Sequence, residues 1–470
     1  MAGVFRRSGK SSDIGGVTME EYLKILLEQI RCKKACPRIV KEVRDHIEEQ
    51  AKANQTEWMM DEEEAMKCAI RDMGDPVEAG VALDRIHRPK IAWDIVALMA
   101  VVSMISLVIH IVIGIHAGET QNQAPGGYIL HAAVYIGAGF LCMMLVYRLD
   151  YSIFAGYGKI AAVLFLAFFT LEIFFTGEAI DGSTAYMQLG SIRISLAQLI
   201  FLYVPVFGAV LYQYHGSGWA GVFQILLFMF YPVWLAFRMP RINLAFLLLL
   251  ILSAMFTVAV WKNWFRIPKK IFLTVYWGIL TVFPAVFVFF AVKSTNIILT
   301  SYREDRLKAF FGGRYDEYDY VTKTLLDILK SSRILGAGKE TVFGNLPDYH
   351  KDYILTFLSS YYGIAAACIV CLLVAAVGIR AFQIAFGQGN RLGMIMGAGS
   401  SLVLLSNTLF NVMENMGILP RTSTFLPFFS YTGTGMIVSY ILMGIVLSVY
   451  RYKNILPADG KKKEAKRQCV

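Results

Sequence analysis

A short run of charged residues precedes one of the long apolar stretches of this chain. Residues 345–357 read NLPDYHKDYILTF, and at the entrance stand Asp348, His350, Lys351 and Asp352. A positioned carboxylate can act as a general base, and a lysine can stabilise a leaving phosphate group. The same pattern fits the first turns of a helix, where carboxylates favour the positive end of the helix dipole. The residues alone leave both interpretations open.

The composition indicates a protein that crosses a membrane many times. Of the 470 residues, 56% are apolar and 17% are charged, and the mean hydropathy is +0.52. This excess of apolar residues excludes a soluble globular protein. The net charge of +10 does not imply nucleic acid as a partner, because cytoplasmic loops of membrane proteins collect Lys and Arg. The seven cysteines form no disulfide or zinc pattern.

Ten apolar stretches are long enough to cross the hydrocarbon core, which takes about 20 residues. An even number places both termini on one side, and the basic residues beside the spans predict that this side is cytoplasmic. A large extracellular loop, residues 293–352, follows the seventh span, and we expect amphipathic helices in it. The predicted spans are 92–114, 128–147, 154–175, 194–213, 218–236, 243–260, 270–292, 353–378, 393–413 and 427–450.

The first part of the chain differs from the apolar remainder. Residues 1–17 are polar and rich in Gly and Ser, which predicts a disordered tail. Residues 18–90 have apolar side chains at helical spacing, so we expect a cytoplasmic domain of about four short helices. This stretch resembles the small helical prefix domain that precedes permease-like membrane domains in many Gram-positive bacteria. The predicted fold class is all-α, with a membrane domain at 91–455 and a basic cytoplasmic tail at 456–470.

A specific motif lies near the end of the membrane domain. Residues 411–435 read NVMENMGILPRTSTFLPFFSYTGTG. They resemble the C-terminal motif of the SEDS family (shape, elongation, division and sporulation; the FtsW, RodA and SpoVE group), which runs N-x5-G-[LI]-x-P-x-T-G-x-x-LPF-x-SYGG-S. Ser423, Thr432 and Thr434 depart from it. The matching residues are Asn411, Gly417, Pro420, Thr422, Leu426, Pro427, Phe428, Ser430, Tyr431 and Gly433.

The extracellular loop carries the same resemblance. Its end is similar to the family's LP-x-x-HTDFIF stretch, in which Lys351 and Tyr353 replace a Thr and a Phe. The resemblance covers about residues 91–455, with the same layout of ten spans. The residues that match the stretch are Leu346, Pro347, His350, Asp352 and Ile354.

The resemblance implies an activity and a catalytic residue. SEDS proteins polymerise peptidoglycan glycan strands from lipid II, an undecaprenyl-diphosphate-linked precursor, in cell shape, division or sporulation. They usually work with a class B penicillin-binding protein in the bacterial cytoplasmic membrane. Asp352 falls on the family's essential acidic residue, so the resemblance implies that it is the catalytic base.

Groups that bind a lipid-linked substrate are expected at the outer membrane surface. The leaving diphosphate needs cationic partners, for which Arg193 is a further candidate, or a divalent cation such as Mg²⁺; no metal ligands are predicted. Asn407 and Asn411 share one helix face, which fits interhelical hydrogen bonds as well as substrate contact. The predicted substrate-binding residues are His350, Lys351, Lys339, Arg303, Arg306, Asn411, Thr422, Ser430, Tyr431 and Gln198.

Some charged positions of the family pattern are filled differently here. Gln198 and Phe201 stand where the family has a Glu and a Lys, and Arg241 stands at an acidic position. These departures keep a second hypothesis open, namely a scaffold or regulator that binds lipid II without polymerising it. Transport of a lipid-linked precursor across the membrane is the third.

Overall fold

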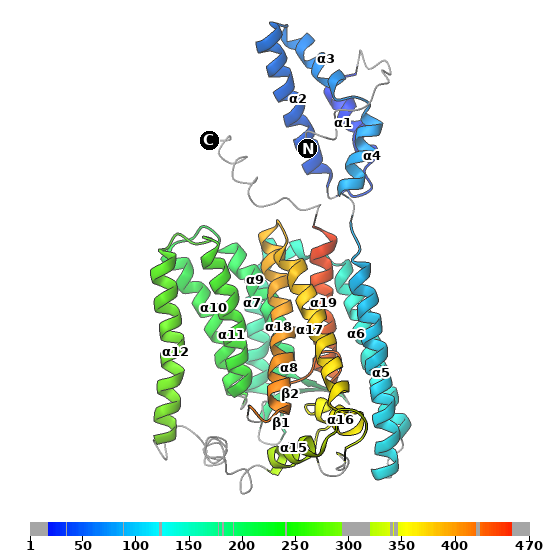
Figure 1. The fold of residues 1–470 in the computed structure, drawn as a ribbon. Coiled ribbons are helices and arrows are strands. Elements are labelled where there is room, and N and C mark those ends of the chain that lie inside the picture. Colours follow the sequence, from blue (N-terminus) through cyan, green and yellow to red (C-terminus); the bar gives the residue numbers. More distant parts are fainter. Residues whose placement is uncertain are drawn as a thin grey trace. The chain divides into compact units, whose positions relative to one another are not determined.

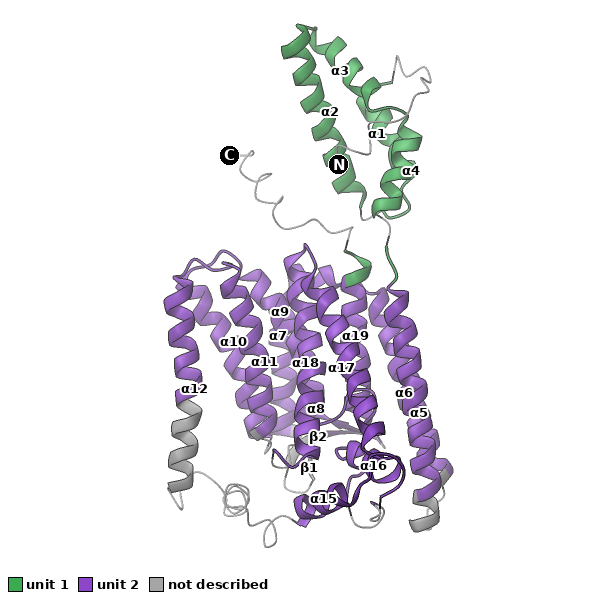
Figure 2. Cartoon of the chain, viewed as in Figure 1, with its two compact units in different colours: residues 1–91, 450–470 green, residues 92–449 purple. Residues whose placement is uncertain are grey.

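The chain forms two compact units, residues 1–91 with 450–470 and residues 92–449 (Figure 2). The computed structural model describes residues 17–33, 35–87, 89–121, 125–176, 178–180, 183–190, 192–239, 242–293, 320–338, 342, 346–419 and 424–453.

The first unit is helical in its described part. Its first helix begins with a capping box, in which the Thr18 hydroxyl accepts from the Glu21 backbone N–H and the Glu21 carboxylate accepts from the Thr18 N–H. Tyr22, Leu26 and Ile47 are buried in its core. The helices are α1 (Met19–Glu28), α2 (Cys36–Trp58), α3 (Glu62–Asp72) and α4 (Pro76–His87).

The second unit is a bundle of long apolar helices (Figure 1). Within the described residues, nine helical stretches are long and apolar enough to cross a membrane, and α12 is a further helix of 25 residues at the predicted seventh span. The prediction of a polytopic helical membrane protein is confirmed. The long helices are α5 (Trp93–Gln121), α6 (Pro125–Arg148), α7 (Phe154–Leu171), α9 (Tyr203–Gln213), α10 (Trp219–Arg238), α11 (Ile242–Trp261), α12 (Lys269–Lys293), α17 (Ile364–Phe386), α18 (Arg391–Asn415) and α19 (Gly433–Arg451).

Shorter elements complete the second unit. A three-stranded antiparallel sheet, in the order β1-β2-β3, interrupts the helical pattern and was not predicted. Its third strand leads directly into α8. The short elements are η1 (Tyr151–Ile153), η2 (Glu172–Thr176), β1 (Glu178–Ile180), β2 (Ser183–Leu189), β3 (Ile192–Ser195), α8 (Leu196–Leu199), η3 (Ile200–Leu202), α15 (Tyr320–Ser331) and α16 (Ile354–Tyr361).

Helix α18 lies at the centre of this bundle. In its apolar part 78% of the residues are buried, against 22% in the apolar part of α6, so the rest of the bundle covers much less of α6 than of α18. Helix α18 packs against α17, α9 and α11. Small residues permit the close approach: a Cβ added at Gly208 would lie 3.3 Å from the Met396 Cα.

The predicted eighth span, residues 353–378, is wrong at its start and at its end. The chain forms α16 first, turns at Gly363 with φ of +101°, and begins α17 only at Ile364. A side chain at Gly363 would approach the Ile334 carbonyl oxygen to 2.6 Å. The Ile334 carbonyl also accepts from the Ala365 N–H at 3.1 Å, so a backbone contact terminates α16 and begins the span.

Candidate active site

Asp352 lies in the turn of residues 347–353 that precedes α16. Helix α16 packs against α15 at one end of the bundle (Figure 1). The exposed fraction of Asp352 is 8%. The Asp352 carbonyl oxygen accepts from the Asn411 Nδ2 at 2.8 Å and from the Asn415 Nδ2 at 3.0 Å. Two side chains of the central helix α18 therefore fix the backbone of the predicted catalytic residue.

Asp348 belongs to the same turn but does not begin a helix. Its φ is +55°, and α16 starts only at Ile354, with Tyr353 as its N-cap. The interpretation of the charged run as the first turns of a helix is therefore wrong for Asp348. Its carboxylate instead accepts from the Lys351 Nζ at 2.9 Å, so the lysine of this turn already has an anionic partner.

His350 packs among aromatic rings. Its ring centre lies 5.8 Å from that of Tyr128 and 5.5 Å from that of Tyr431. Burial in these surroundings lowers the pKa of His350 to about 4; the positive charge of Lys351 adds to the effect and Asp348 opposes it. The imidazole of His350 is therefore neutral near pH 7.

The lowered pKa of His350 predicts a loss of stability in acid. In the unfolded chain His350 binds a proton as pH falls below its ordinary pKa of 6.5, whereas in the folded chain it does so only near pH 4. The folded state therefore loses stability as pH falls through this window. The drop in melting temperature between pH 7.5 and pH 5 should be smaller in His350→Gln than in the wild type. The exposed His46 provides the control, since His46→Gln should keep the wild-type drop. Equal drops in all three proteins would contradict the assignment.

The segment 424–432 faces this turn. The Tyr431 N–H donates to the His350 carbonyl oxygen at 2.9 Å, which joins the two motif stretches directly. The Ser430 hydroxyl accepts from the Leu426 N–H at 2.7 Å and so closes a turn within the segment. The tenth span was predicted to begin at residue 427, but its helix, α19, begins only at Gly433.

Helix α5 holds the segment from its other side. The Ser106 hydroxyl donates to the Phe428 carbonyl oxygen at 2.8 Å, and the His110 Nε2 lies 2.8 Å from the Phe429 carbonyl oxygen. The His110 Nδ1 lies 3.0 Å from the Tyr128 hydroxyl. The motif stretches themselves do not include His110.

Helix α18 contributes three polar side chains near one another. Both N–H groups of Asn411 are engaged by backbone, at Asp352 and at the Thr424 carbonyl oxygen 2.9 Å away, which favours the hydrogen-bonding interpretation of this residue. Glu414, 3% exposed, accepts from the Thr424 hydroxyl at 3.0 Å. Sequence reasoning missed Glu414 and Asn415. Polar residues three and four positions after Asn411, on one face at membrane depth, were the available signal.

The departures from the family pattern lie beside the same segment. Gln198 on α8 is 7% exposed, and its Cδ would lie 3.1 Å from a Cβ at Gly435. The ring centre of Phe201 is 6.1 Å from that of Phe425. These two positions therefore place an amide and an aromatic ring against residues 424–435.

The structure brings together some of the predicted site residues and does not describe others. Arg193 is exposed on β3. The predicted site residues that lie in or around the turn are His350, Lys351, Asp352, Asn411, Ser430 and Tyr431. The residues named above that lie outside the described part of the chain are Lys339, Arg303, Arg306, Thr422 and Arg241. Among the residues that are described, no three His, Cys, Asp or Glu side chains form a group that could hold a metal ion.

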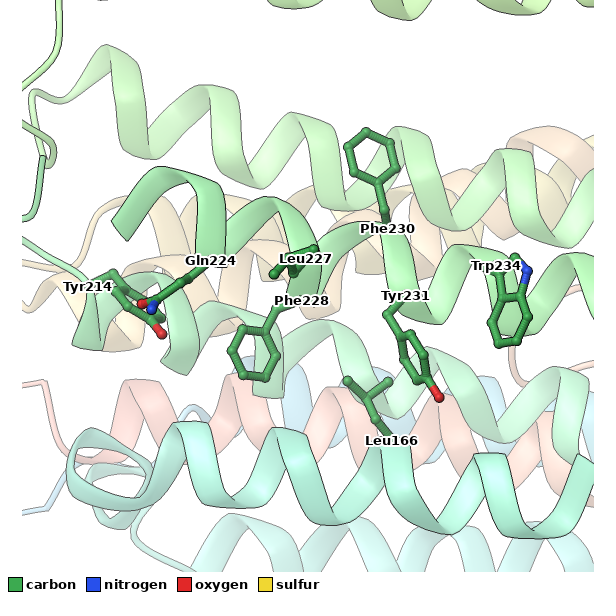
Figure 3. A pocket seen from close by; sticks show the side chains of 8 residues that line it. All are labelled: Leu166, Tyr214, Gln224, Leu227, Phe228, Phe230, Tyr231 and Trp234. Carbon is green, nitrogen blue, oxygen red and sulfur yellow. The ribbon is translucent and has the colours of Figure 1, made fainter. Parts of the chain in front are cut away.

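A separate pocket opens between α7 and α10 (Figure 3). Its volume is about 630 Å³, and none of the predicted site residues lines it. Phe228, Tyr231 and Leu166 point into it, and the Tyr231 hydroxyl lies 2.9 Å from the Thr170 hydroxyl. The pocket is apolar and lies within the membrane-spanning helices, apart from the turn that carries Asp352.

The fold and these buried polar contacts define a multi-pass membrane protein of the helical-bundle class. The chain belongs to the FtsW, RodA and SpoVE family, described as cell cycle proteins, whose model matches residues 91–455. A relative from Thioalkalivibrio sulfidiphilus, a probable peptidoglycan glycosyltransferase FtsW, is 25% identical over 403 residues, which cover 82% of this chain and 94% of the relative. A second such protein, from Borreliella burgdorferi, is 30% identical over 174 residues, 36% of this chain and 48% of that relative.

Two solved structures share the fold. One belongs to work on the structural coordination of polymerization and crosslinking by a peptidoglycan synthase complex; it has a TM-score of 0.62, 20% identity, and covers 77% of this chain and 98% of its own. The other is the rod shape determining protein RodA of Thermus thermophilus, with a TM-score of 0.52, 18% identity, and coverage of 77% and 97%.

Proposed function

We propose that this protein is a peptidoglycan glycosyltransferase that polymerises glycan strands from lipid II at the outer face of the bacterial cytoplasmic membrane. The observation that carries the proposal is the junction of the two motif stretches. The Tyr431 N–H bonds to His350, while Asn411 bonds to Asp352. Residues that are about 60 to 80 positions apart in the chain thus meet at the turn that carries the buried residue Asp352.

In the proposed reaction Asp352 is the general base. It takes the proton of an acceptor sugar hydroxyl as that oxygen forms a new bond to the donor sugar, and the bond between the donor sugar and the diphosphate breaks. Its low exposure keeps bulk water from the proton it takes, and its fixed backbone aims the carboxylate.

The leaving diphosphate requires positive charge nearby. Lys351 is the described cation of the turn, and Lys339, Arg303 and Arg306 remain the other proposed contacts. A divalent cation such as Mg²⁺ would supply the same charge, although the described residues contain no group of three His, Cys, Asp or Glu side chains around which to place it.

The proposed setting follows from the family and the basic residues beside the spans. Both termini lie in the cytoplasm, and the site faces the outer surface, where lipid-linked substrates are delivered. A class B penicillin-binding protein is the proposed partner that cross-links the product, in cell shape, division or sporulation.

A lipid II-binding scaffold or regulator is the second candidate. Gln198 and Phe201 favour it, because they carry no charge and lie against the segment that faces Asp352. Fewer charges around the site would leave lipid II binding through its tail and sugars while reducing the chance of turnover.

Purified protein in liposomes with fluorescent lipid II separates these candidates. The enzyme hypothesis predicts glycan strands on a gel and bound lipid II in a pull-down. Binding without strands, with or without a class B penicillin-binding protein, would overturn the enzyme and support the scaffold. Movement of labelled lipid across the bilayer without strands would instead support a transporter.

A further inference from the structure

Asn415 links the Asp352 turn to the first turn of α16. Its Nδ2 donates to the Asp352 carbonyl oxygen at 3.0 Å and to the Asn411 carbonyl oxygen at 2.9 Å. Its Oδ1 accepts from the Thr356 N–H at 3.1 Å and from the Thr356 hydroxyl at 2.9 Å. A side-chain amide has two N–H donors and one oxygen whose two lone pairs can each accept a hydrogen bond. Both donors and both acceptor positions of Asn415 are therefore used within the protein.

Glu414 holds the segment that faces this turn, residues 424–431, through Thr424. The carboxylate accepts from the Thr424 hydroxyl, while the Thr424 carbonyl accepts from Asn411. Asn411 thereby joins the two halves, because its amide also donates to Asp352. In the motif that this chain resembles, positions 414 and 415 belong to the unspecified residues between Asn411 and Gly417, so the motif does not account for either side chain.

Each of the two held segments contains one strained residue. Asp348 has φ of +55° and Phe428 has φ of +67°. Such conformations in residues other than glycine persist only where the surroundings impose them. The bonds from α18 to Asp352 and to Thr424 fall four residues from each strained position. They are suited to keep both segments in these conformations.

We propose that Asn415 and Glu414 are positioning residues of the site: Asn415 fixes the backbone of Asp352, and Glu414 fixes the segment 424–431 that faces it. Both are 3% exposed, and the hydrogen bonds described above join them to other parts of the protein. The proposal rests on the proposed glycosyl transfer for its effect on rate. The hydrogen bonds of Asn415 to Asp352 and of Glu414 to Thr424 do not depend on the proposed function.

Asn415→Ala tests the proposal against Asn407→Ala. Asn407 lies on the same helix, is also buried, and donates only to the Val403 carbonyl of its own helix among the described hydrogen bonds. We expect Asn415→Ala to lower kcat about tenfold to a hundredfold with KM for lipid II within about twofold, since misplacing a catalytic group has effects of this size. Asn407→Ala should retain both parameters within about twofold.

Hydrogen exchange supplies a readout that does not depend on activity. Amides of residues 346–356 should exchange about tenfold faster in Asn415→Ala than in Asn407→Ala, because their anchor is lost. In Glu414→Ala the faster exchange should instead appear in residues 424–432. If Asn415→Ala does not fold, Asn415→Asp replaces it: the carboxylate keeps an acceptor for Thr356 and has no N–H for Asp352.

The outcomes distinguish the inference from the proposed function. Equal kcat and equal exchange in Asn415→Ala and Asn407→Ala would overturn the positioning role. A wild-type protein that makes no glycan would overturn the proposed function. The exchange experiment would still test whether Asn415 and Glu414 hold the two segments in place. A raised KM with unchanged kcat would show that Asn415 acts on binding, and would also overturn the inference.

Discussion

Asp352→Asn should lower kcat for lipid II polymerisation by about 10²- to 10⁴-fold, which is the usual contribution of a positioned general base. The substitution keeps the shape of the side chain but removes the group that accepts the proton. The two bonds to its carbonyl oxygen involve the backbone and remain possible, so the folded state and lipid II binding should persist. Turnover of purified protein in liposomes measures the effect.

Asp348→Asn is the matched control for this experiment. Asp348 lies four residues earlier in the same turn and pairs with Lys351 near the surface. We expect its loss to change kcat by less than about threefold, since exposed ion pairs contribute little. An Asp352→Asn protein with wild-type turnover would remove Asp352 from the mechanism, and equal losses in both variants would point to a general disturbance of the turn.

Asn411→Leu should produce the largest loss of stability among the site residues. The substitution removes both N–H groups, so the buried Thr424 carbonyl loses its bond from Asn411 and the Asp352 carbonyl keeps the bond from Asn415. An unsatisfied buried group costs about 1–3 kcal/mol, and we expect a loss of that order with a lower melting temperature. Turnover should fall with it, because one side chain holds both segments.

Asn407→Leu provides the comparison for Asn411→Leu. The Asn407 Oδ1 is buried without a hydrogen-bond partner among the described residues, and its Nδ2 bonds within α18. Replacing this amide by an apolar side chain of similar size should leave the melting temperature unchanged or raise it. A melting temperature that falls equally in both variants would contradict the special role of Asn411.

The long spans could be predicted because their length and apolar character are set by the membrane. Residues 92–114 correspond to α5 and 393–413 to α18, where about 20 apolar residues leave few alternatives. The predicted ends were less accurate. Helix ends depend on caps and neighbouring backbone, which apolar length does not encode.

The break between α16 and α17 could not be predicted from apolar length. Residues 353–378 form one continuous apolar pattern, yet the chain turns at Gly363 because the backbone around Ile334 contacts it from a distant part of the chain. The sheet was missed although the sequence contains a signal for it. Strands β2 and β3 pair with Leu189 opposite Ile192, and the Gly190 turn between them is a recognisable hairpin signal.

The motifs predict residues of the candidate site, but they do not predict the side chains that hold those residues in place. The motif stretches identified Asp352, His350 and Tyr431, and the structure places them together. Glu414 and Asn415 follow no motif, so only the fold reveals their bonds to Thr424 and Asp352. Side chains that act on another residue's backbone leave little trace in a sequence pattern.

The most direct test of the central claim compares wild-type and Asp352→Asn proteins at equal concentrations of folded protein, with labelled lipid II in liposomes. The measured quantity is the ladder of glycan strands on a gel, with bound lipid II determined in the same samples. We expect a ladder from the wild type and none from Asp352→Asn, with similar binding by both. Ladders of equal intensity, or no ladder from wild-type protein that binds lipid II, would contradict this claim.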